Sequence, residues 1–427
     1  MHYVIAGNGV AGITAAFTLR ERDPRARITV VSGESPYFFS RTALMYAYMD
    51  RMNLRDLEPY ERTEYDARRI DRVQDWVTDL DARARVLRLK SGRDLGYDRL
   101  LLATGSVPRR GEWPGLESVR DGVVHFVSLQ DLQRCERLTP ATREAVVAGG
   151  GLIGIELVEC LRHHGVDVTF LVKEKWYWPV ALAPEEGGMI AEHARHHGVR
   201  LRLDEEIAEV LSAPGGRVRA VKTTRGDELP AQMLGVTIGV RPAVDWLQSV
   251  ATAPEVKRGI VVDPAFRTSL ENVYAAGDCA QIGDLVEQIW YSAKRQGELA
   301  ARSMLGDPVS YRPPVFYNSA KFFDIEYTTA GDLLRLPPSA RTFFYRVPGR
   351  NITLRLVEAE GVFAGCSLLG SRWDHTVFER WIEERRPLSY VAGHLESAQF
   401  DVEFGRLDLR PVKQAFRHQG ALAAEVL

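Results

Sequence analysis

The chain has 427 residues, 45% of them hydrophobic and 26% charged, which is the balance of a folded globular protein and excludes a disordered or fibrous one. Its length predicts roughly two to four domains, each with its own buried core. Lys and Arg number 55 against 57 Asp and Glu, so the net charge of −2 supplies no overall field that would draw the protein to nucleic acid.

No apolar run approaches the roughly 18 residues of a membrane span. The chain enters an apolar strand pattern at Tyr3 without a basic leader or a cleavage site. We therefore expect a cytoplasmic protein with no integral membrane segment. Four cysteines lie far apart and form no CxxC pair, which fits a reducing compartment; they are Cys135, Cys160, Cys279 and Cys366.

A strand, a glycine turn, a helix and a second strand are predicted at the start of the chain. An apolar YVIA precedes GNGVAG at residues 7–12, a helix runs through Leu19, and ITVV follows at residues 28–31. The same order recurs later, with AVVA, then GGGLIG at residues 149–154, a helix through His164, and VTFLV at residues 168–172. Two copies imply two separate dinucleotide-binding folds.

The connecting segments predict how these folds are ordered. Residues 97–109 form a buried strand and a turn, WPG at residues 113–115 marks a crossing, and LGVTIGVRP at residues 234–242 marks the return. We predict an α/β protein with two Rossmann-like domains, the second inserted in the first, and a smaller C-terminal α+β domain. The predicted boundaries are 1–112 and 241–310 for the first domain, 113–240 for the second, and 311–427 for the C-terminal domain and tail.

Glycines in a GxGxxG turn allow a tight bend and a close approach of the backbone to pyrophosphate, whose charge then lies at a helix N-terminus. An acid at the end of the next strand can bind the adenosine ribose, and Glu34 has suitable spacing. Alone, such a turn is equally well an ordinary glycine turn. TSLENVYAAGD at residues 268–278 supplies the context, because its small residues admit a cofactor and Asp278 can accept hydrogen bonds from a polyol.

Taken together, GNGVAG, Glu34, LLLATG, GGGLIG, TIGVRP and RTSLENVYAAGDCA resemble the successive fingerprints of the FAD-dependent pyridine nucleotide-disulfide oxidoreductase superfamily over roughly the first 310 residues. The resemblance implies an FAD-binding first domain and an NAD(P)H-binding second domain. It assigns to FAD the residues Gly7, Gly9, Gly12, Glu34, Arg41, Thr104, Gly105, Gly277 and Asp278. It assigns to NADH or NADPH the residues Gly149, Gly151 and Gly154.

The segment YFFSR at residues 37–41 stands where disulfide reductases of the superfamily carry redox cysteines, and it contains none. It is more similar to the ferredoxin and rubredoxin reductases and to apoptosis-inducing factor, which have an arginine near the place of Arg41. Ferredoxin reductases pair a lysine near the flavin with a glutamate matched by Glu156, but Met45 and Tyr46 occupy the lysine's neighbourhood. Trp290 resembles an aromatic residue that lines the flavin, although core packing explains it equally well. These resemblances make Glu156, Trp290 and Arg41 the candidate catalytic residues.

The implied activity is transfer of a hydride from NAD(P)H to flavin N5 and of electrons onward to an unidentified acceptor, such as ferredoxin, rubredoxin, quinone or oxygen, without a redox disulfide. A small redox protein as partner and a homodimer are compatible with the resemblance. The alternative is a slow, redox-gated flavoprotein that acts as an assembly switch, as apoptosis-inducing factor does.

Two further patterns bear on ligands. Lys173 and Glu174 follow the second strand of the NAD(P)H unit, where an acid favours NADH and basic groups favour NADPH, and they are expected to read the ribose with weak discrimination. His193 and His197 lie one helical turn apart and could hold zinc, but no third ligand stands at a recognised spacing. We interpret them as part of a solvated helix face and predict no metal.

Overall fold

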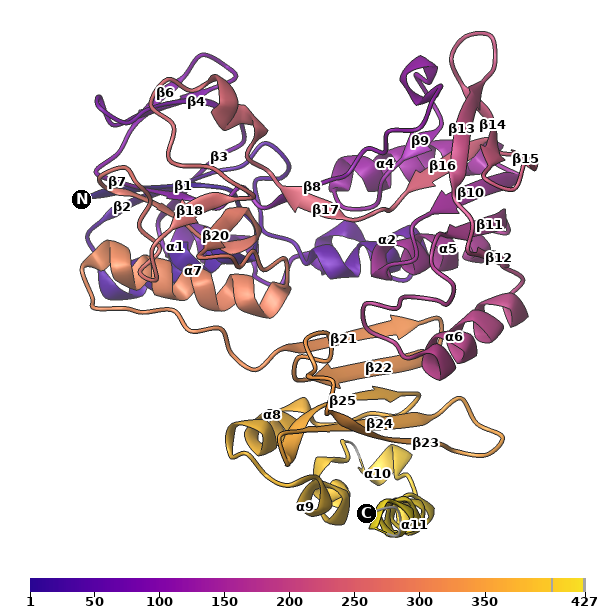
Figure 1. Cartoon of the computed structure of the whole chain (residues 1–427). Coiled ribbons are helices and arrows are strands. Elements are labelled where there is room, and N and C mark those ends of the chain that lie inside the picture. Colours follow the sequence, from indigo (N-terminus) through magenta and orange to yellow (C-terminus); the bar gives the residue numbers. More distant parts are fainter. Residues whose placement is uncertain (401, 425–427) are drawn as a thin grey trace. The chain divides into compact units, whose positions relative to one another are not determined.

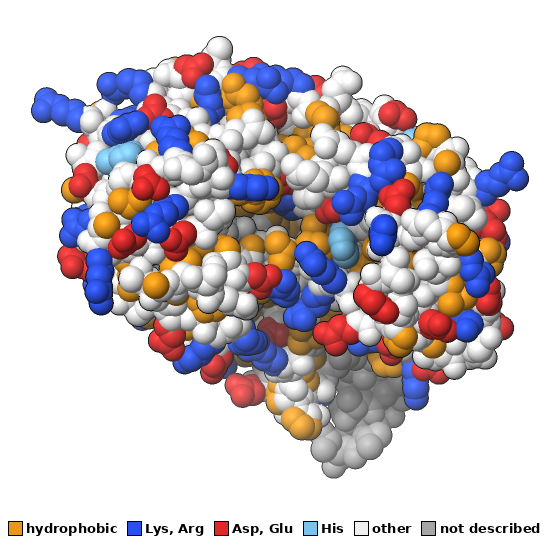
Figure 2. All heavy atoms as spheres, turned by 90° about the horizontal axis from the view of Figure 1, so that it is seen from above, with side chains coloured by type: hydrophobic (Ala, Val, Ile, Leu, Met, Phe, Trp, Pro, Cys, Tyr) orange, Lys and Arg blue, Asp and Glu red, His pale blue; other side chains and the backbone are white. Residues whose placement is uncertain are grey.

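The computed structural model describes residues 1–400 and 402–424, which form two compact units. Unit 1 comprises residues 1–142, 212–219 and 232–312, and unit 2 comprises residues 143–211, 220–231 and 313–427. Within the described part of the chain, helices long and apolar enough to cross a membrane are absent. Basic and acidic side chains are intermingled on the face in Figure 2, in keeping with the nearly balanced charge.

A five-stranded parallel sheet forms the centre of unit 1 (Figure 1). Its strands, in spatial order, are β19 (Val273–Ala275), β7 (Arg99–Leu102), β1 (His2–Ala6), β2 (Arg27–Val31) and β3 (Ile70–Val73). Near-continuous apolar runs make β1, β2, β7 and β19, as expected for a sheet covered on both faces, whereas the edge strand β3 (IDRV) contains two charged residues. Because β19 pairs with β7, the chain returns to the first fold after the second glycine turn, and this confirms the predicted Rossmann-like architecture.

Helices α1 (Val10–Arg22) and α7 (Trp290–Leu305) pack closely against each other beside this sheet (Figure 1). Their contact depends on small residues: a Cβ atom built on Gly297 would lie 2.2 Å from the carbonyl oxygen of Ala11. Any larger side chain at this position would force the helices apart. The close packing places the N-terminal half of α7 beside the first glycine turn.

A short antiparallel pair in unit 1 joins β8 (Ser106–Pro108), where the sequence predicts a turn, to β17 (Val240–Pro242), the end of the predicted return segment. The remaining helices of this unit are α2 (Leu44–Tyr48), α3 (Arg62–Ala67) and α4 (Leu129–Leu138). Its remaining strands are β4 (Val77–Asp81), β5 (Val86–Leu89), β6 (Asp94–Gly96), β9 (Val123–Val124), β16 (Met233–Val236), β18 (Ile260–Val262) and β20 (Ala280–Ile282).

Unit 2 begins with the second strand, turn and helix pattern. Parallel strands β10 (Glu144–Ala148), β11 (Asp167–Val172) and β12 (Arg200–Leu203) are joined by α5 (Leu152–His163) and α6 (Pro184–His196). The sequence predicts that the helix after the second glycine turn runs through His164, and α5 ends one residue earlier, at His163. Short strands β13 (Ile207–Ser212), β14 (Val218–Thr223) and β15 (Glu228–Pro230) follow.

An antiparallel five-stranded sheet makes the C-terminal part of unit 2, in the order β21-β22-β25-β24-β23 (Figure 1). Its strands are β21 (Tyr317–Phe322), β22 (Ile325–Ala330), β23 (Arg341–Arg346), β24 (Thr353–Ala359) and β25 (Val362–Leu369). The helices that follow are α8 (His375–Glu383), α9 (Leu388–Gly393), α10 (Val402–Gly405) and α11 (Arg410–Ala424). Phe378 and Trp381 of α8 share one apolar core with strands β24 and β25. The Asp374 side chain caps α8 by accepting a hydrogen bond from the backbone N–H of Thr376.

Candidate functional site

The first glycine turn lies between β1 and α1, and its glycines have different physical roles. Gly7 has φ of +118°, and a Cβ atom there would lie 2.0 Å from the carbonyl oxygen of Ala103. A Cβ atom on Gly12 would lie 2.0 Å from the carbonyl oxygen of Gly7. Both glycines are therefore required by the fold itself. Gly9 differs, because a Cβ atom there would meet no atom within 4 Å.

Gly9 is also the N-cap residue of α1, and no side chain caps the helix. The first backbone N–H groups of this helix therefore face open space beside Gly9 and can bind an anionic group. Asn8 adds a buried side-chain oxygen that has no hydrogen-bond partner; this oxygen is an acceptor, so it suits a hydroxyl group and not a phosphate. The open space beside Gly9 and the N–H groups at the start of α1 are what suit a bound pyrophosphate.

Glu34 follows β2 and is held in place by Arg41. Arg41 donates to both carboxylate oxygens of Glu34, at 3.0 and 2.7 Å, and the backbone N–H of Leu129 donates to one of them at 2.9 Å. Arg41 also donates to the backbone carbonyl of Val127. The Glu34 side chain is 18% exposed, so a ribose hydroxyl can reach the lone pairs that remain.

Asp278 lies after β19, in the short helical turn of residues 277–279. Burial raises the pKa of its carboxyl, although the hydrogen bond from Ser106, at 2.8 Å, and the charge of Arg41 oppose the change. The structure thus brings Asp278, Arg41 and Glu34 to one side of unit 1. Thr104 and Gly105 join this region to the return segment, because Thr104 donates to the Ala243 carbonyl and the Ala243 N–H donates to the Gly105 carbonyl.

A polar network beneath Gly277 was not found from the sequence. The Gly277 N–H donates to Gln296 of α7 at 2.8 Å, and Gln296 donates to Glu287 at 3.1 Å. The Tyr311 hydroxyl donates to the same carboxylate at 2.6 Å. One signal was available: Gln296 stands at helical spacing between the small apolar residues Ala293 and Ala300, on the face that α7 buries.

Trp290 is the first residue of α7 and is partly buried. Its ring meets Tyr291 edge to face at 5.3 Å, and the Lys294 ammonium lies 5.5 Å from its centre. The indole N–H is buried without a hydrogen-bond partner, as is the side-chain amide nitrogen of Gln288. Core packing alone leaves such donors unsatisfied, whereas a polar ligand would satisfy them.

The second glycine turn repeats the first in unit 2. Gly149 has φ of +115°, Gly151 is the N-cap residue of α5, and Gly154 is buried. A Cβ atom on Gly151 would meet no atom within 4 Å, as at Gly9. The hydroxyl of Tyr177 donates to the Gly151 carbonyl at 3.4 Å. The predicted NAD(P)H turn therefore has the same open helix N-terminus as the predicted FAD turn.

Glu156 lies on α5, directly after this turn. Removal from water, reinforced by the nearby charge of Glu159, raises the pKa of its carboxyl to about 8, although part of the side-chain surface still reaches solvent. Burial and the charge of Glu156 also raise the pKa of Tyr177 well above its ordinary value. At neutral pH, Glu156 is therefore largely a neutral acid that can donate a hydrogen bond.

Lys173 and Glu174, which are expected to contact the coenzyme ribose, follow the end of β11 and differ in their exposure. Lys173 is exposed and Glu174 is half-buried, and the Glu174 carbonyl accepts from the backbone N–H of Asp204 at 2.9 Å.

The four cysteines, which all lie within the described residues, are buried and form no disulfide. Burial raises the pKa of the Cys135, Cys279 and Cys366 thiols, which makes them poor nucleophiles.

Residues 1–297 match the pyridine nucleotide-disulphide oxidoreductase family. The ferredoxin–NAD(+) reductase component of the biphenyl dioxygenase system of Paraburkholderia xenovorans is 31% identical over 316 residues, which are 71% of this chain and 75% of that protein. A rubredoxin–NAD(+) reductase of Pseudomonas putida is 28% identical over 331 residues, covering 75% of this chain and 84% of the relative. An NADH oxidase of Methanocaldococcus jannaschii is 25% identical, covering 87% and 88%.

Solved structures have the same fold. Putidaredoxin reductase in its covalent complex with putidaredoxin has a TM-score of 0.81 at 22% identity, over 90% of this chain and 94% of that one. The water-forming NADH oxidase of Lactobacillus brevis, bound to NADH, also has a TM-score of 0.81, at 20% identity, over 99% and 100% of the two chains. The family match, the relatives and the two glycine turns agree. This chain belongs to the FAD-dependent pyridine nucleotide-disulphide oxidoreductase family and is an oxidoreductase that uses FAD and NAD(P)H.

Proposed function

We propose that this chain takes hydride equivalents from NAD(P)H and reduces a small iron–sulfur protein of the ferredoxin or rubredoxin type. One observation carries the choice of acceptor: the described chain has no thiol where a redox disulfide would relay electrons. Buried Phe38 and Phe39 occupy that segment, and all four cysteines are themselves buried. Relatives named as ferredoxin and rubredoxin reductases support the same acceptor class.

We propose that FAD is held by the first glycine turn, with Gly9 beside its pyrophosphate, Glu34 at its adenosine ribose and Asp278 at its polyol chain. Thr104, Gly105 and Gly277 line the same region. Bound FAD supplies a two-electron acceptor that can release electrons singly, which suits a one-electron iron–sulfur partner. Gly149, Gly151 and Gly154 bind the pyrophosphate of NAD(P)H in the same manner.

The three candidate catalytic residues receive separate roles. Arg41 positions Glu34 through two hydrogen bonds, and its charge opposes the rise in the pKa of Asp278 that burial causes. Trp290 offers an unpartnered indole N–H at the start of α7. Glu156, as a neutral acid, can donate to a carbonyl such as that of the nicotinamide amide.

Rapid mixing of the protein with NADH or NADPH tests this proposal. We expect fast bleaching of the flavin, followed by reoxidation that is faster with a ferredoxin or a rubredoxin than with oxygen or a quinone. A variant with all four cysteines replaced by Ala should reduce its flavin within about twofold of the parent rate, since all four thiols are buried and burial raises the pKa of three of them. A collapse of that rate with FAD content intact would show that a sulfur participates.

The names of the relatives are those of reductases and oxidases, so the assembly-switch alternative is not favoured. Slow flavin reduction accompanied by a change of oligomer would nevertheless replace the proposal by that switch. The predicted domain boundaries, the homodimer and the cytoplasmic location stay predictions. Buried cysteines that form no disulfide are consistent with a reducing compartment.

A further inference from the structure

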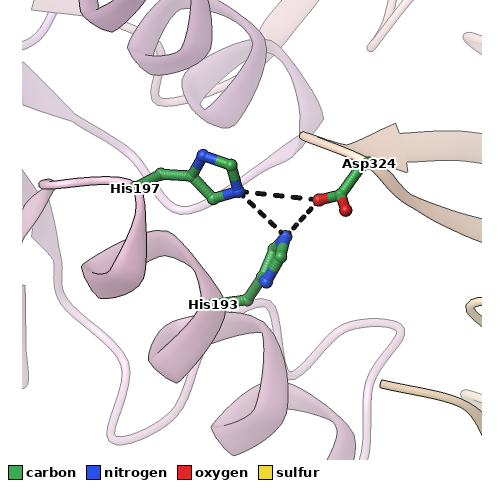
Figure 3. Close-up of side chains that lie close together, drawn as sticks. All are labelled: His193, His197 and Asp324. Carbon is green, nitrogen blue, oxygen red and sulfur yellow. Dashed lines mark hydrogen bonds and ion pairs between the residues drawn. The ribbon is translucent and has the colours of Figure 1, made fainter. Parts of the chain in front are cut away.

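Two histidines and an aspartate lie together in unit 2, away from the second glycine turn. His193 is in the last turn of α6, His197 caps the end of that helix, and Asp324 is at the tip of the hairpin between β21 and β22 (Figure 3). Nε2 of His193 lies 2.5 Å from Oδ1 of Asp324 and 3.2 Å from Nε2 of His197. Nε2 of His197 lies 3.5 Å from the same carboxylate oxygen.

The sequence showed the two histidines but no third ligand, because Asp324 is far from them along the chain, in the turn between β21 and β22. The structure also corrects the expectation of a solvated helix face, since the His193 side chain is only 11% exposed. His197 and Asp324 remain accessible, at 42% and 75%. Three potential ligand atoms, all within 4.8 Å of one another, therefore meet at a site that solvent can reach.

We propose that His193, His197 and Asp324 bind a divalent transition-metal ion, with Zn²⁺ preferred and water as the fourth ligand. Neutral imidazole suits zinc-like ions, while Mg²⁺ and Ca²⁺ prefer all-oxygen sites. Metal–ligand bonds of about 2.0 to 2.1 Å in a tetrahedral site put neighbouring ligand atoms about 3.3 to 3.4 Å apart. The distances of 3.2 and 3.5 Å match this spacing, and the hydrogen-bonded His193 to Asp324 distance has to open.

The surroundings of the His193 ring allow its proton to change position when a metal ion binds. Without metal, the Asn351 side-chain amide lies 3.3 Å from Nδ1 of His193, and Nε2 of His193 can donate to Asp324. Metal at Nε2 requires the ring proton on Nδ1, where a turned Asn351 amide accepts it through its oxygen. No proton has to leave a neutral ring, because it moves from one ring nitrogen to the other.

The turn conformation and a ring contact hold the tip of the hairpin, which carries Asp324, beside the two histidines. Phe322 and Ile325 are paired, so Phe323 and Asp324 form a two-residue turn, and Phe323 has φ of +57°, a conformation that usually requires glycine. The His197 ring stacks on Phe323 at 4.3 Å and 9°. This contact fixes the tip so that Asp324 faces both histidines.

Two features of α6 bear on the entry of a cation. The C-terminal end of a helix carries a partial negative charge, which favours a cation beside His193 and His197. An open hollow of about 250 Å³ adjoins His193 and is lined in part by Glu192, Arg346 and Asn351. Arg346 opposes a cation and Glu192 attracts one, so the three ligands, more than the surrounding field, determine binding.

The site would fasten the hairpin to α6. Phe322, next to the tip, meets Tyr177 edge to face at 5.9 Å, and Tyr177 donates to the Gly151 carbonyl of the second glycine turn. A metal ion that bridges α6 and the hairpin would therefore stabilise the packing beneath that turn. We expect the ion to raise the thermal stability of the protein.

The test uses the full, FAD-loaded chain without a histidine tag, stripped of metal by a chelator and then titrated calorimetrically with Zn²⁺. We expect one Zn²⁺ per chain, no comparable binding of Mg²⁺, and tetrahedral visible absorption with Co²⁺. His197→Phe keeps a ring over Phe323, and Asp324→Asn keeps the shape of the side chain. Each should weaken Zn²⁺ binding by at least about 100-fold, since even second-shell partners are worth about 10- to 100-fold.

His196→Ala is the matched control, because His196 is on the same helix and lines the same hollow as His193, but its Nδ1 lies 3.0 Å from the Glu192 carbonyl and it is not one of the three ligand residues. It should bind Zn²⁺ like the parent. Thermal unfolding provides a second readout: Zn²⁺ should raise the Tm of the parent and of His196→Ala, and not that of the two ligand variants. The proposal is overturned if the parent binds no Zn²⁺ stoichiometrically, or if His197→Phe and Asp324→Asn bind it as the parent does.

Discussion

The two glycine turns have nearly the same backbone and different surroundings. Gly7 and Gly149 have φ of +118° and +115°, and Gly9 and Gly151 both begin a helix with open space beside them. In unit 1 the nearby acid, Glu34, is paired with Arg41. In unit 2 the nearby acid, Glu156, is removed from water, and the charge of Glu159 adds to the rise in its pKa.

Under the proposed assignment, this difference lets one motif serve two nucleotides. Both units have an open helix N-terminus that suits an anion, so we expect the two turns to share an affinity for pyrophosphate. We expect neighbouring residues to decide the chemistry: the carboxylate of Glu34, anchored by Arg41, can hold a ribose, whereas a neutral Glu156 can donate to a carbonyl.

Equivalent glycine substitutions should separate the two ligands. Gly9→Ala adds a methyl group that the protein itself accommodates but that blocks a close pyrophosphate, so we expect FAD content to fall at least about tenfold with the fold intact. Gly151→Ala should leave FAD bound and raise KM for NAD(P)H by at least about tenfold. Flavin absorbance per chain, circular dichroism and steady-state kinetics measure these effects.

Gly12→Ala is the control for a purely structural glycine, because its Cβ would overlap the Gly7 carbonyl. It should fail to fold, and not merely release FAD. Equal loss of FAD in Gly9→Ala and Gly151→Ala would show that the two turns do not divide the ligands as proposed.

Coenzyme choice should respond to smaller changes at the end of β11. Lys173 is exposed and Glu174 half-buried, so both can reach a ribose, and we expect weak discrimination in the parent. A charge-assisted contact is worth roughly 1.5 to 3 kcal/mol, or about tenfold to a hundredfold in selectivity. Lys173→Glu should shift the ratio of kcat/KM values toward NADH, and Glu174→Ala should shift it toward NADPH.

Lys257→Glu makes the same change of charge in unit 1, and it should leave this ratio unchanged. If the ratio is the same in the parent, Lys173→Glu and Glu174→Ala, neither side chain reads the ribose and the coenzyme residues have been assigned to the wrong strand end.

Local patterns predict much of this fold. The glycine turns and the apolar strands depend on residues that are close in sequence. The return of β19 to the first sheet could be predicted from the recurring order of the motifs. Glu34 and Asp278 could be proposed for the same reason, since each follows a strand end at a recognisable position.

Partners brought together by packing could not be predicted in this way. Ser106 reaches Asp278, Tyr177 lies by Glu156, and Asp324 meets His193 only when distant strands are in place. Asp324 in particular lies on a hairpin whose tip has no metal-binding spacing in the sequence. Its geometry depends on the φ of Phe323 and on the stacking of His197, which periodicity does not encode.

The smallest expected effect is on stability, and it tests the environment of Glu156. Its folded pKa of about 8 lies above the ordinary value of 4.5, so the group contributes stability that is fully present below pH 4.5 and is lost as the pH rises through 8. Glu156→Gln keeps the neutral shape and cannot ionise. At pH 9 it should therefore be more stable than the parent, by about 1.4 kcal/mol or more, since a pKa difference of one between the folded and unfolded states already amounts to about 1.4 kcal/mol. At pH 4 and below the two should be alike. Glu159→Gln removes the second cause of the shift, so it should lower the folded pKa and make the total loss of stability at pH 9 smaller than in the parent. Thermal unfolding from pH 4 to 9 measures all three proteins, and equal pH dependence in the parent and Glu156→Gln would mean that Glu156 is ionised and hydrated, like an ordinary surface acid.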